Sequence, residues 1–347
     1  MLYEKVRESS FELVRLIAMW MIVIYHQYYR HIQPAFETPF NQEIWLPLHI
    51  GVPLFVLISG YWGIHISGKG LARLLGQMLI YTAILTIAYD YLTNGGYRPV
   101  INNLMLVSKS PRWFMRTYIC LYLFSPVINK YLCNITTKQR VYLLLSLLFI
   151  SVYIGTFGND PSLSDGKNLA NFLTLYVIGN TLHAYEKFWK KIPVYYIITV
   201  YLLINISVVS VYNLFYGTFV AKGIWKIFFP YQSPGLILNS ILFFLIVLHW
   251  RFKSKAINWF ASSALAIYLI HESSLVRNYI LGPVTLEIRE YLGNDYLTLP
   301  AIIFMALVLC FVCILLDKLL SPLWRCFARI GDVVENKLKT KMNKWWE

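Results

Sequence analysis

The sequence predicts an all-α, polytopic transmembrane helical bundle of about ten spans, with both termini in the cytoplasm. Hydrophobic residues make up 58% of the 347-residue chain, and charged residues make up only 14%, against about 25% in a typical soluble domain. The mean hydropathy is +0.54, and apolar runs long enough to cross a bilayer recur along the chain. This composition leaves too little polar surface for a water-soluble protein.

The apolar runs divide the chain into the expected spans. In order, they cover residues 11–31, 45–64, 71–93, 113–133, 141–157, 169–185, 193–215, 234–250, 258–280 and 298–320. An even number of spans places both termini on the same side of the membrane. Residues 1–324 are expected to form a single membrane domain, and residues 325–347 a basic amphipathic tail on the cytoplasmic leaflet.

The distribution of basic residues supports this orientation. With the N-terminus inside, 20 of the 31 lysines and arginines lie in cytoplasmic segments, ten lie outside, and Arg15 lies within the first span. Cytoplasmic loops are expected to carry such an excess. The net charge of +14 therefore reflects membrane topology, and we expect no nucleic-acid partner. Cys310 and Cys313 form a C-x-x-C within an apolar run, which favours packing residues over a metal site.

The first span contains two polar groups, Arg15 and His26, eleven residues apart. On a helix this spacing is 20° more than three turns, so both side chains share one face, about 16 Å apart along the axis. A charged residue deep in a span costs about 2.5–3.5 kcal/mol, and such residues usually mark function. Alternatively, Arg15 could extend to lipid phosphates and His26 could be an ordinary packing residue.

The second span contains Pro47, Pro53 and the pair Ser59-Gly60. Such a helix is expected to be irregular, and irregular backbone at membrane depth is tolerated where it lines a cavity. Beyond its cytoplasmic end, Lys69 and Arg73 are four residues apart, which places them on one helix face. They could bind an anion or simply be the basic residues common on the cytoplasmic side.

Polar groups also begin the fourth span and interrupt the ninth. Arg112, Trp113 and Arg116 open the fourth span from the outside, although an interfacial aromatic belt would also explain the tryptophan. The ninth span carries His271 and Glu272 at middle to outer depth. The cations thus gather at the cytoplasmic boundary and the imidazoles lie further out. This arrangement would suit a cytoplasmic polyanion with a long neutral arm, such as an acyl-CoA. A histidine could then act as general base toward a hydroxyl. A lipid phosphate would also fit the cations.

Several of these segments together resemble the acyltransferase-3 family, the membrane acyltransferases of bacterial surface glycans. Arg15 and His26 are similar to its R-x10-H signature. Residues 52–62, VPLFVLISGYW, resemble its F-F-x-x-S-G-F/Y segment; residues 112–128 resemble W-F-x-x-x-Y/L…P; and residues 264–271, ALAIYLIH, resemble I-Y-L-x-H. Lys69 and Arg73 stand where the family has R-x-x-R, with a different spacing. No appended extracytoplasmic hydrolase-like domain is evident.

The resemblance implies O-acyl transfer, most often of acetyl, from cytoplasmic acyl-CoA to a sugar hydroxyl in the bacterial cytoplasmic membrane, without a metal. It implies that His26 is the catalytic base or acyl carrier and that Arg15 contacts the donor or orients His26. Lys69 and Arg73 would bind the coenzyme A phosphates, with Ser59 as a further donor-side candidate. The acceptor side would comprise Arg112, Trp113 and Arg116, with His271 and Glu43 as secondary candidates, and Glu43 as a candidate partner for His26.

Two other classes of protein remain as alternatives. A carrier or flippase for lipid-linked sugars would use basic groups to bind pyrophosphate and histidines to relay protons, but paired broken helices in two related halves are not evident. A polysaccharide polymerase would be expected to have a large outer loop with basic and acidic groups. The expected partners of the chain are acyl-CoA, a glycan acceptor and the bilayer, and homo-oligomerisation is left open.

Overall fold

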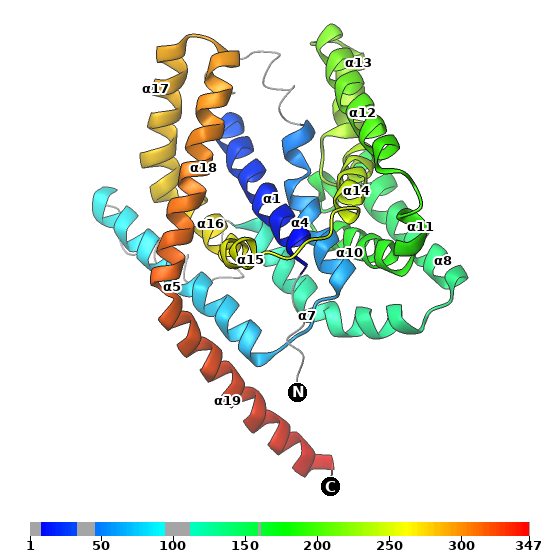
Figure 1. Ribbon diagram of the computed structural model, residues 1–347, viewed down its shortest axis with the longest axis vertical. Coiled ribbons are helices and arrows are strands. Elements are labelled where there is room, and N and C mark those ends of the chain that lie inside the picture. Colours follow the sequence, from blue (N-terminus) through cyan, green and yellow to red (C-terminus); the bar gives the residue numbers. More distant parts are fainter. Residues whose placement is uncertain (1–7, 33–45, 94–111, 159–160, 347) are drawn as a thin grey trace.

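The computed structural model describes residues 8–32, 46–93, 112–158 and 161–346, and within them the chain is helical without strands (Figure 1). The elements are α1 Ser9–Gln27, η1 Tyr28–Ile32, α4 Gly51–Trp62, α5 Gly68–Thr93, α7 Trp113–Asn134, α8 Thr137–Leu148, η2 Phe149–Ile154, α9 Gly155–Phe157, η3 Ser164–Gly166, α10 Leu169–Ala184, α11 Glu186–Trp189, α12 Val194–Leu214, α13 Phe219–Phe228, α14 Pro234–Leu248, α15 Lys255–Ala261, α16 Ala264–His271, η4 Val276–Leu281, α17 Gly282–Leu292, α18 Asp295–Leu319 and α19 Ser321–Trp346.

Five helical segments of the described chain are long and apolar enough to cross a membrane. They are Ser9–Ile32, Gly68–Thr93, Thr137–Phe157, Val194–Leu214 and Asp295–Leu319. The segments Leu46–Trp62 and Pro234–Leu248 are shorter apolar helices. The prediction of an all-helical membrane protein is therefore confirmed, while the count of ten spans and the side on which the termini lie remain predictions.

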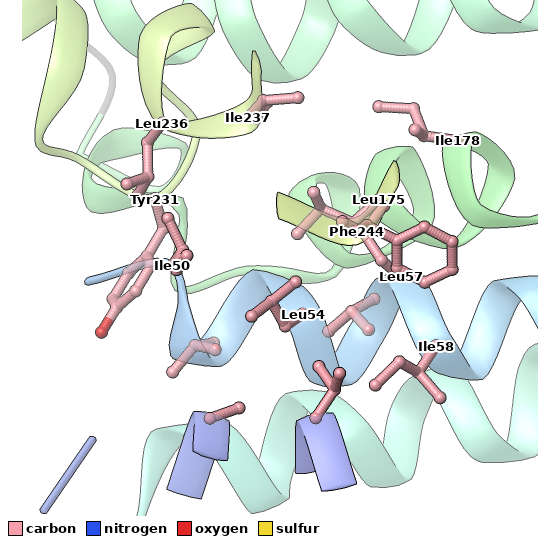
Figure 2. Packing of buried hydrophobic residues seen from close by; sticks show 14 of the residues in the cluster. Ile50, Leu54, Leu57, Ile58, Leu175, Ile178, Tyr231, Leu236, Ile237 and Phe244 are labelled. Carbon is pink, nitrogen blue, oxygen red and sulfur yellow. The ribbon is translucent and has the colours of Figure 1, made fainter. Parts of the chain in front are cut away.

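One apolar cluster joins α1, α4, α10 and α14 (Figure 2). Helices α4 and α10 cross closely because each has a glycine at the crossing: a Cβ on Gly60 would overlap the backbone of Tyr176, and one on Gly179 would overlap the backbone of Leu57. This contact fixes α4 against the rest of the bundle. Helix α4 also packs closely on α1, where a Cβ on Gly51 would overlap Ala18 and Ile22.

A second cluster packs α1 against α5, α16 and α18. Cys310 and Cys313 are free and buried in it, in agreement with the expectation that they are packing residues. Nearby, the buried carboxylate of Asp317 accepts hydrogen bonds from Tyr81 (3.0 Å) and from the indole of Trp324 (2.9 Å). These bonds connect α5, α18 and the first turns of α19.

Helix α19 crosses the expected boundary between the membrane domain and the tail at residue 325. It begins at Ser321, contains the buried Trp324, and packs along α5 at a close approach of Gly331 to Gly68. Figure 1 shows α19 extending beyond the rest of the bundle. The division of the chain into a domain and a tail remains a prediction.

The expected span 258–280 is not one continuous helix. It consists of α15, a turn at residues 262–263, α16, and the π-helical η4, with a break after His271. At this break the Ser273 hydroxyl accepts a hydrogen bond from the amide of Val276 (3.2 Å) and donates one to the carbonyl of Ile270 (2.7 Å). A serine that bonds to nearby backbone competes with regular helix. The break places Glu272 at the end of α16.

Candidate active site

One face of α1 and η1 lines a cavity of about 90 Å³. Met19, Ile22, His26 and Arg30 recur at intervals of three and four residues and all contribute to its wall. Arg15 lies one turn earlier on the same face, where its Nη1 pairs with Glu12 Oε1 at 2.6 Å. One water molecule needs about 10–15 Å³ of cavity volume. The cavity therefore has room for about six waters, or for one small group of a ligand.

The remaining described residues of the wall come from four other parts of the chain. They are Val52 and Phe55 of α4, Arg112, Trp113 and Phe114 at the start of α7, Tyr231 before α14, and Tyr268, Glu272, Ser274 and Arg277 of α16 and the segment after it. Rings and aliphatic groups form one part of this wall. Charged groups gather on the other, around the break after α16.

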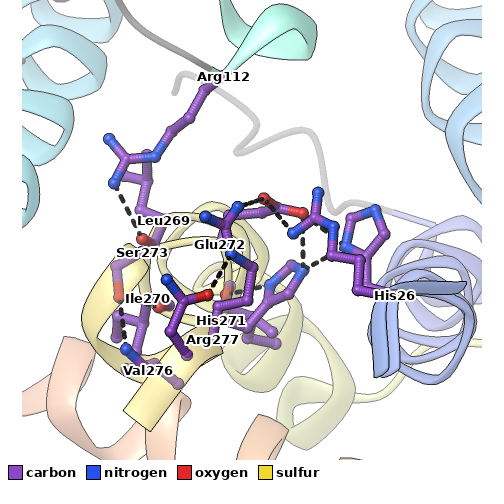
Figure 3. A network of polar contacts seen from close by, with 12 residues as sticks. His26, Arg112, Leu269, Ile270, His271, Glu272, Ser273, Val276 and Arg277 are labelled. Carbon is purple, nitrogen blue, oxygen red and sulfur yellow. Dashed lines mark hydrogen bonds and ion pairs between the residues drawn. The ribbon is translucent and has the colours of Figure 1, made fainter. Parts of the chain in front are cut away.

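Two histidines and a glutamate meet at this break (Figure 3). His26 Nδ1 lies 3.0 Å from His271 Nε2 and 2.6 Å from Glu272 Oε1. The side chain of His271 is 1% exposed and that of Glu272 is 9% exposed. Because His26 belongs to α1 and the other two to the end of α16, the packing of these helices determines the distances.

The hydrogen bonds of His271 define the roles of the ring nitrogens. Its Nδ1 lies 2.7 Å from the carbonyl oxygen of Ile267, and a carbonyl can only accept a hydrogen bond. Nδ1 of His271 is therefore the donor, and the neutral ring keeps its lone pair on Nε2. His26 then carries its proton on Nδ1 and donates it to His271 Nε2 at 3.0 Å, while Glu272 Oε1 lies 2.6 Å from the same nitrogen as an ion-pair contact. The lone pair of neutral His26 is on Nε2, the nitrogen available as a base.

The other oxygen of Glu272 contacts two arginines. Arg30 Nη1 lies 2.9 Å from Oε2 of Glu272, and Arg277 Nη1 lies 3.9 Å from the same atom. The carboxylate of Glu272 therefore contacts an imidazole through Oε1 and two guanidinium groups through Oε2. This division holds the carboxylate in place, and a carboxylate fixed beside an imidazole orients it and stabilises its protonated form.

Arg112 approaches the same cavity from α7. Its Nη1 donates to Thr82 Oγ1 at 2.5 Å and its Nη2 to the carbonyl of Leu269 at 3.4 Å. Its neighbour Trp113 also lines the cavity, with its ring 5.4 Å from that of Tyr231 between centroids. Both residues line the cavity together with His26, and their assignment to the acceptor side remains a prediction.

His26, His271 and Glu272 are also the residues of the described chain that could hold a metal ion, since one ligand atom from each lies within 4.8 Å of the others. A divalent cation here would face the guanidinium groups of Arg30 and Arg277, which already contact the carboxylate. Like charges at this distance repel. The arrangement therefore favours proton transfer through His26 over metal coordination.

The other predicted residues lie away from this cluster. Ser59 donates to the carbonyl of Phe55 and lies 3.1 Å from the hydroxyl of Tyr118, one turn further along α4 than the cavity wall. Lys69 and Arg73 are exposed in the first turns of α5, and Arg116 is exposed on α7. Glu43 lies outside the described residues.

Sequence reasoning did not assign Glu272, Arg30 or Arg277 to the site. Arg30 follows His26 by four residues and so shares its face, a signal that could have identified it. Glu272 is an acidic residue in an apolar run, directly after His271. Its pairing with His26 could not be read from that position, because the two residues are far apart in the chain.

Residues 8–317 match the family model described as an acyltransferase domain, Acyl_transf_3. The match covers nearly the whole chain and includes every helix that contributes to the cavity. No curated protein and no solved structure matches the chain.

Proposed function

Because the chain belongs to the acyltransferase-3 family, whose domain model it matches over residues 8–317, we propose the following reaction for this membrane acyltransferase. It moves an acyl group, acetyl in the first instance, from cytoplasmic acyl-CoA to a sugar hydroxyl. The acceptor is a surface polysaccharide or its lipid-linked precursor, and the enzyme works in the bacterial cytoplasmic membrane.

The observation that carries the proposal is the contact of His26 Nδ1 with Glu272 Oε1 at 2.6 Å, in a cavity that both residues line. It supports His26 as general base toward the acceptor hydroxyl. Nε2 takes the hydroxyl proton while the hydroxyl oxygen attacks the thioester carbonyl carbon. Glu272 stabilises the imidazolium that forms, as the carboxylate of a catalytic triad does.

The tetrahedral intermediate then collapses. Its C–S bond breaks, the sulfur leaves and takes the proton back from His26, and the products are the O-acyl sugar and coenzyme A. The oxyanion of the intermediate needs nearby donors, and the guanidinium of Arg30, on the same helix face as His26 and lining the cavity, is a candidate. Every proton that leaves the acceptor thus ends on coenzyme A.

The donor side of the proposal rests on the polar residues at the cytoplasmic end. Lys69 and Arg73 are exposed in the first turns of α5, where the phosphates of coenzyme A could reach them. The acyl-bearing arm would pass Arg15 and the Ser59–Tyr118 pair before reaching His26. Phosphate recognition by exposed lysine and arginine is screened by salt, so Lys69→Ala combined with Arg73→Ala should weaken acyl-CoA binding more at low salt than at high salt.

The test uses the full-length protein in nanodiscs with radiolabelled acetyl-CoA and a glycan extract as acceptor. The wild type, His26→Ala and His65→Ala are compared for binding, slow hydrolysis and transfer. His65 is exposed, so it controls for the loss of a histidine. We expect His26→Ala to retain donor binding and to lose turnover by about 10²–10⁴-fold, the usual contribution of general acid–base catalysis, while His65→Ala keeps both.

Two results would contradict the proposal. A folded His26→Ala variant with wild-type turnover would remove His26 from the chemistry. A well-folded wild type that binds no acyl-CoA would exclude acyl transfer from coenzyme A and favour a carrier of lipid-linked sugars.

A further inference from the structure

One part of the cavity wall consists of apolar side chains. Among the described residues, these are Met19 and Ile22 of α1, Val52 and Phe55 of α4, and Phe114 of α7. A polar group placed against them would lose its hydrogen bonds to water, whereas methyl and methylene groups are favoured there. This part of the wall therefore suits the hydrocarbon tail of an acyl group.

Two phenylalanines are the largest side chains of this apolar part of the wall. The rings of Phe55 and Phe114 meet edge to face, with centroids 6.3 Å apart. Both residues pack against both apolar clusters of the bundle. The ring of Phe114 also lies 5.7 Å from that of Tyr118 and 5.6 Å from that of Tyr268. Rings packed on several sides cannot move aside without disturbing the interior, so the depth of the cavity is fixed on this side.

The cavity leaves little room beyond the reacting groups. Its volume of about 90 Å³ corresponds to about six waters. In the proposed transfer it must hold the thioester carbonyl, the acceptor hydroxyl and the acyl chain beyond the carbonyl at the same time. The acyl group is the leading end of the donor, so its chain cannot trail outside the cavity. Each methylene added to the chain therefore competes for space with the side chains of the wall.

We propose that Phe55 and Phe114 limit the length of the acyl group, so that the donor is the coenzyme A ester of a short aliphatic acid, with acetyl preferred over propionyl and butyryl. The inference rests on the proposed acyl transfer and identifies residues that select its donor. The bond changes are the same for each acyl group: the acceptor oxygen bonds to the carbonyl carbon and the C–S bond breaks. The two rings change only which donors fit beside His26.

The test compares donors of increasing length. Full-length protein in nanodiscs, with a glycan extract as acceptor, is assayed for kcat/KM with acetyl-CoA, propionyl-CoA and butyryl-CoA. A difference of one methylene in an apolar pocket changes kcat/KM by about 10–200-fold. We therefore expect the wild type to prefer acetyl-CoA over butyryl-CoA by at least about tenfold, with propionyl-CoA between them.

Variants of the two rings then locate the preference. Phe55→Ala should raise the butyryl-to-acetyl ratio of kcat/KM by at least about tenfold, because a packed core closes only partly around a deleted side chain. Phe114→Leu removes less volume and should change the ratio in the same direction by a smaller factor. Thermal unfolding identifies the folded variants, and Phe55→Leu replaces Phe55→Ala if the alanine variant does not fold.

A matched control removes a buried ring elsewhere. Phe244 of α14 is fully buried and packs against Phe11 (5.4 Å between centroids) and Tyr61 (5.3 Å), outside the described cavity wall. Phe244→Leu should leave the ratio at its wild-type value. An equal change in this variant would overturn the proposal, because loosened packing anywhere in the bundle would then have the same effect.

Two further results would overturn it. One is a wild type that transfers acetyl and butyryl groups with equal kcat/KM, and the other is a wild-type ratio in the folded variants of Phe55 and Phe114. A failure of the proposed acyl transfer gives a different result, since acyl-CoA binding or turnover would then be absent with every donor. Equal or unchanged ratios, in contrast, are measured on an enzyme that turns over.

Discussion

Two glutamates with arginine partners, Glu272 and Glu186, show how differently a charged cluster can be used in this protein. Glu186, at the start of α11, accepts hydrogen bonds from Tyr61 (2.6 Å) and Arg251 (2.6 Å) and pairs with Lys190 (2.7 Å). Its partners hold α4, α11 and the segment after α14 together. Its side chain is 24% exposed, compared with 9% for Glu272.

The difference lies in what the carboxylate holds. Glu186 bonds to Tyr61 and Arg251, and these bonds join separate segments of the chain. Glu272 contacts an imidazole with a free ring nitrogen and lines a cavity with it. Ion pairing alone therefore does not identify a functional site; a paired carboxylate that orients a titratable group toward a cavity is the stronger signal.

The sharpest way to test this comparison is to neutralise each glutamate in turn. Glu272→Gln should lower acyl transfer by about 10²–10⁴-fold, because the amide cannot stabilise the imidazolium of His26. Glu186→Gln should leave the turnover of the folded protein near the wild-type value. Radiolabelled transfer at saturating acyl-CoA measures both, and equal losses in the two variants would show that the clusters do not differ in role.

A smaller effect is expected at His271. His271→Ala removes the acceptor at 3.0 Å from His26 Nδ1 but leaves Glu272 in place. Misplacement of a reacting group by about 1 Å can cost about a hundredfold, so we expect kcat to fall by about ten- to a hundredfold with little change in the affinity for acyl-CoA. A loss as large as that of Glu272→Gln would mean that His271 itself transfers a proton.

In the Glu186 cluster, Tyr61→Phe should affect stability rather than catalysis. The variant removes the hydroxyl that donates to Glu186 and lies 3.1 Å from the guanidinium of Arg251. A hydrogen bond to a charged group contributes about 1.5–3 kcal/mol, and the partial exposure of Glu186 places the expected loss near the lower value. Unfolding in detergent measures the change, with transfer activity as the control. Unchanged stability would show that water replaces the hydroxyl.

The smallest effect concerns pH. Burial by itself would raise the pKa of Glu186. The hydrogen bonds from Lys190 and Tyr61 and the charge of Arg251 together have the larger effect, and they lower this pKa from 4.5 to about 2. Since the folded-state pKa is depressed, the stabilisation is fully present above pH 4.5 and is lost as the pH falls toward 2. The stability advantage of the wild type over Glu186→Gln should therefore shrink between pH 6 and pH 3. A constant difference would contradict the shift.

The sequence predicted several features correctly because they depend on local composition and helix periodicity. Its apolar runs indicated a helical membrane protein, and its motifs indicated the acyltransferase-3 family. The eleven-residue spacing of Arg15 and His26 identified the face of α1 that carries the cavity wall. Each of these follows from side chains close together in the chain, where the 3.6-residue repeat determines which of them share a face.

Only the tertiary structure decided how the site is assembled. His26 and Glu272 meet because α1 packs against α16 and because the helix breaks after His271, whereas the sequence predicted one continuous span over residues 258–280. The sequence offered only Glu43, which lies outside the described residues, as a candidate partner for His26. His26 and His271 are 245 residues apart, and no periodicity relates positions on different helices. Contacts between helices depend on how their surfaces pack, such as the glycine crossing of α4 and α10, and packing is a property of the whole bundle.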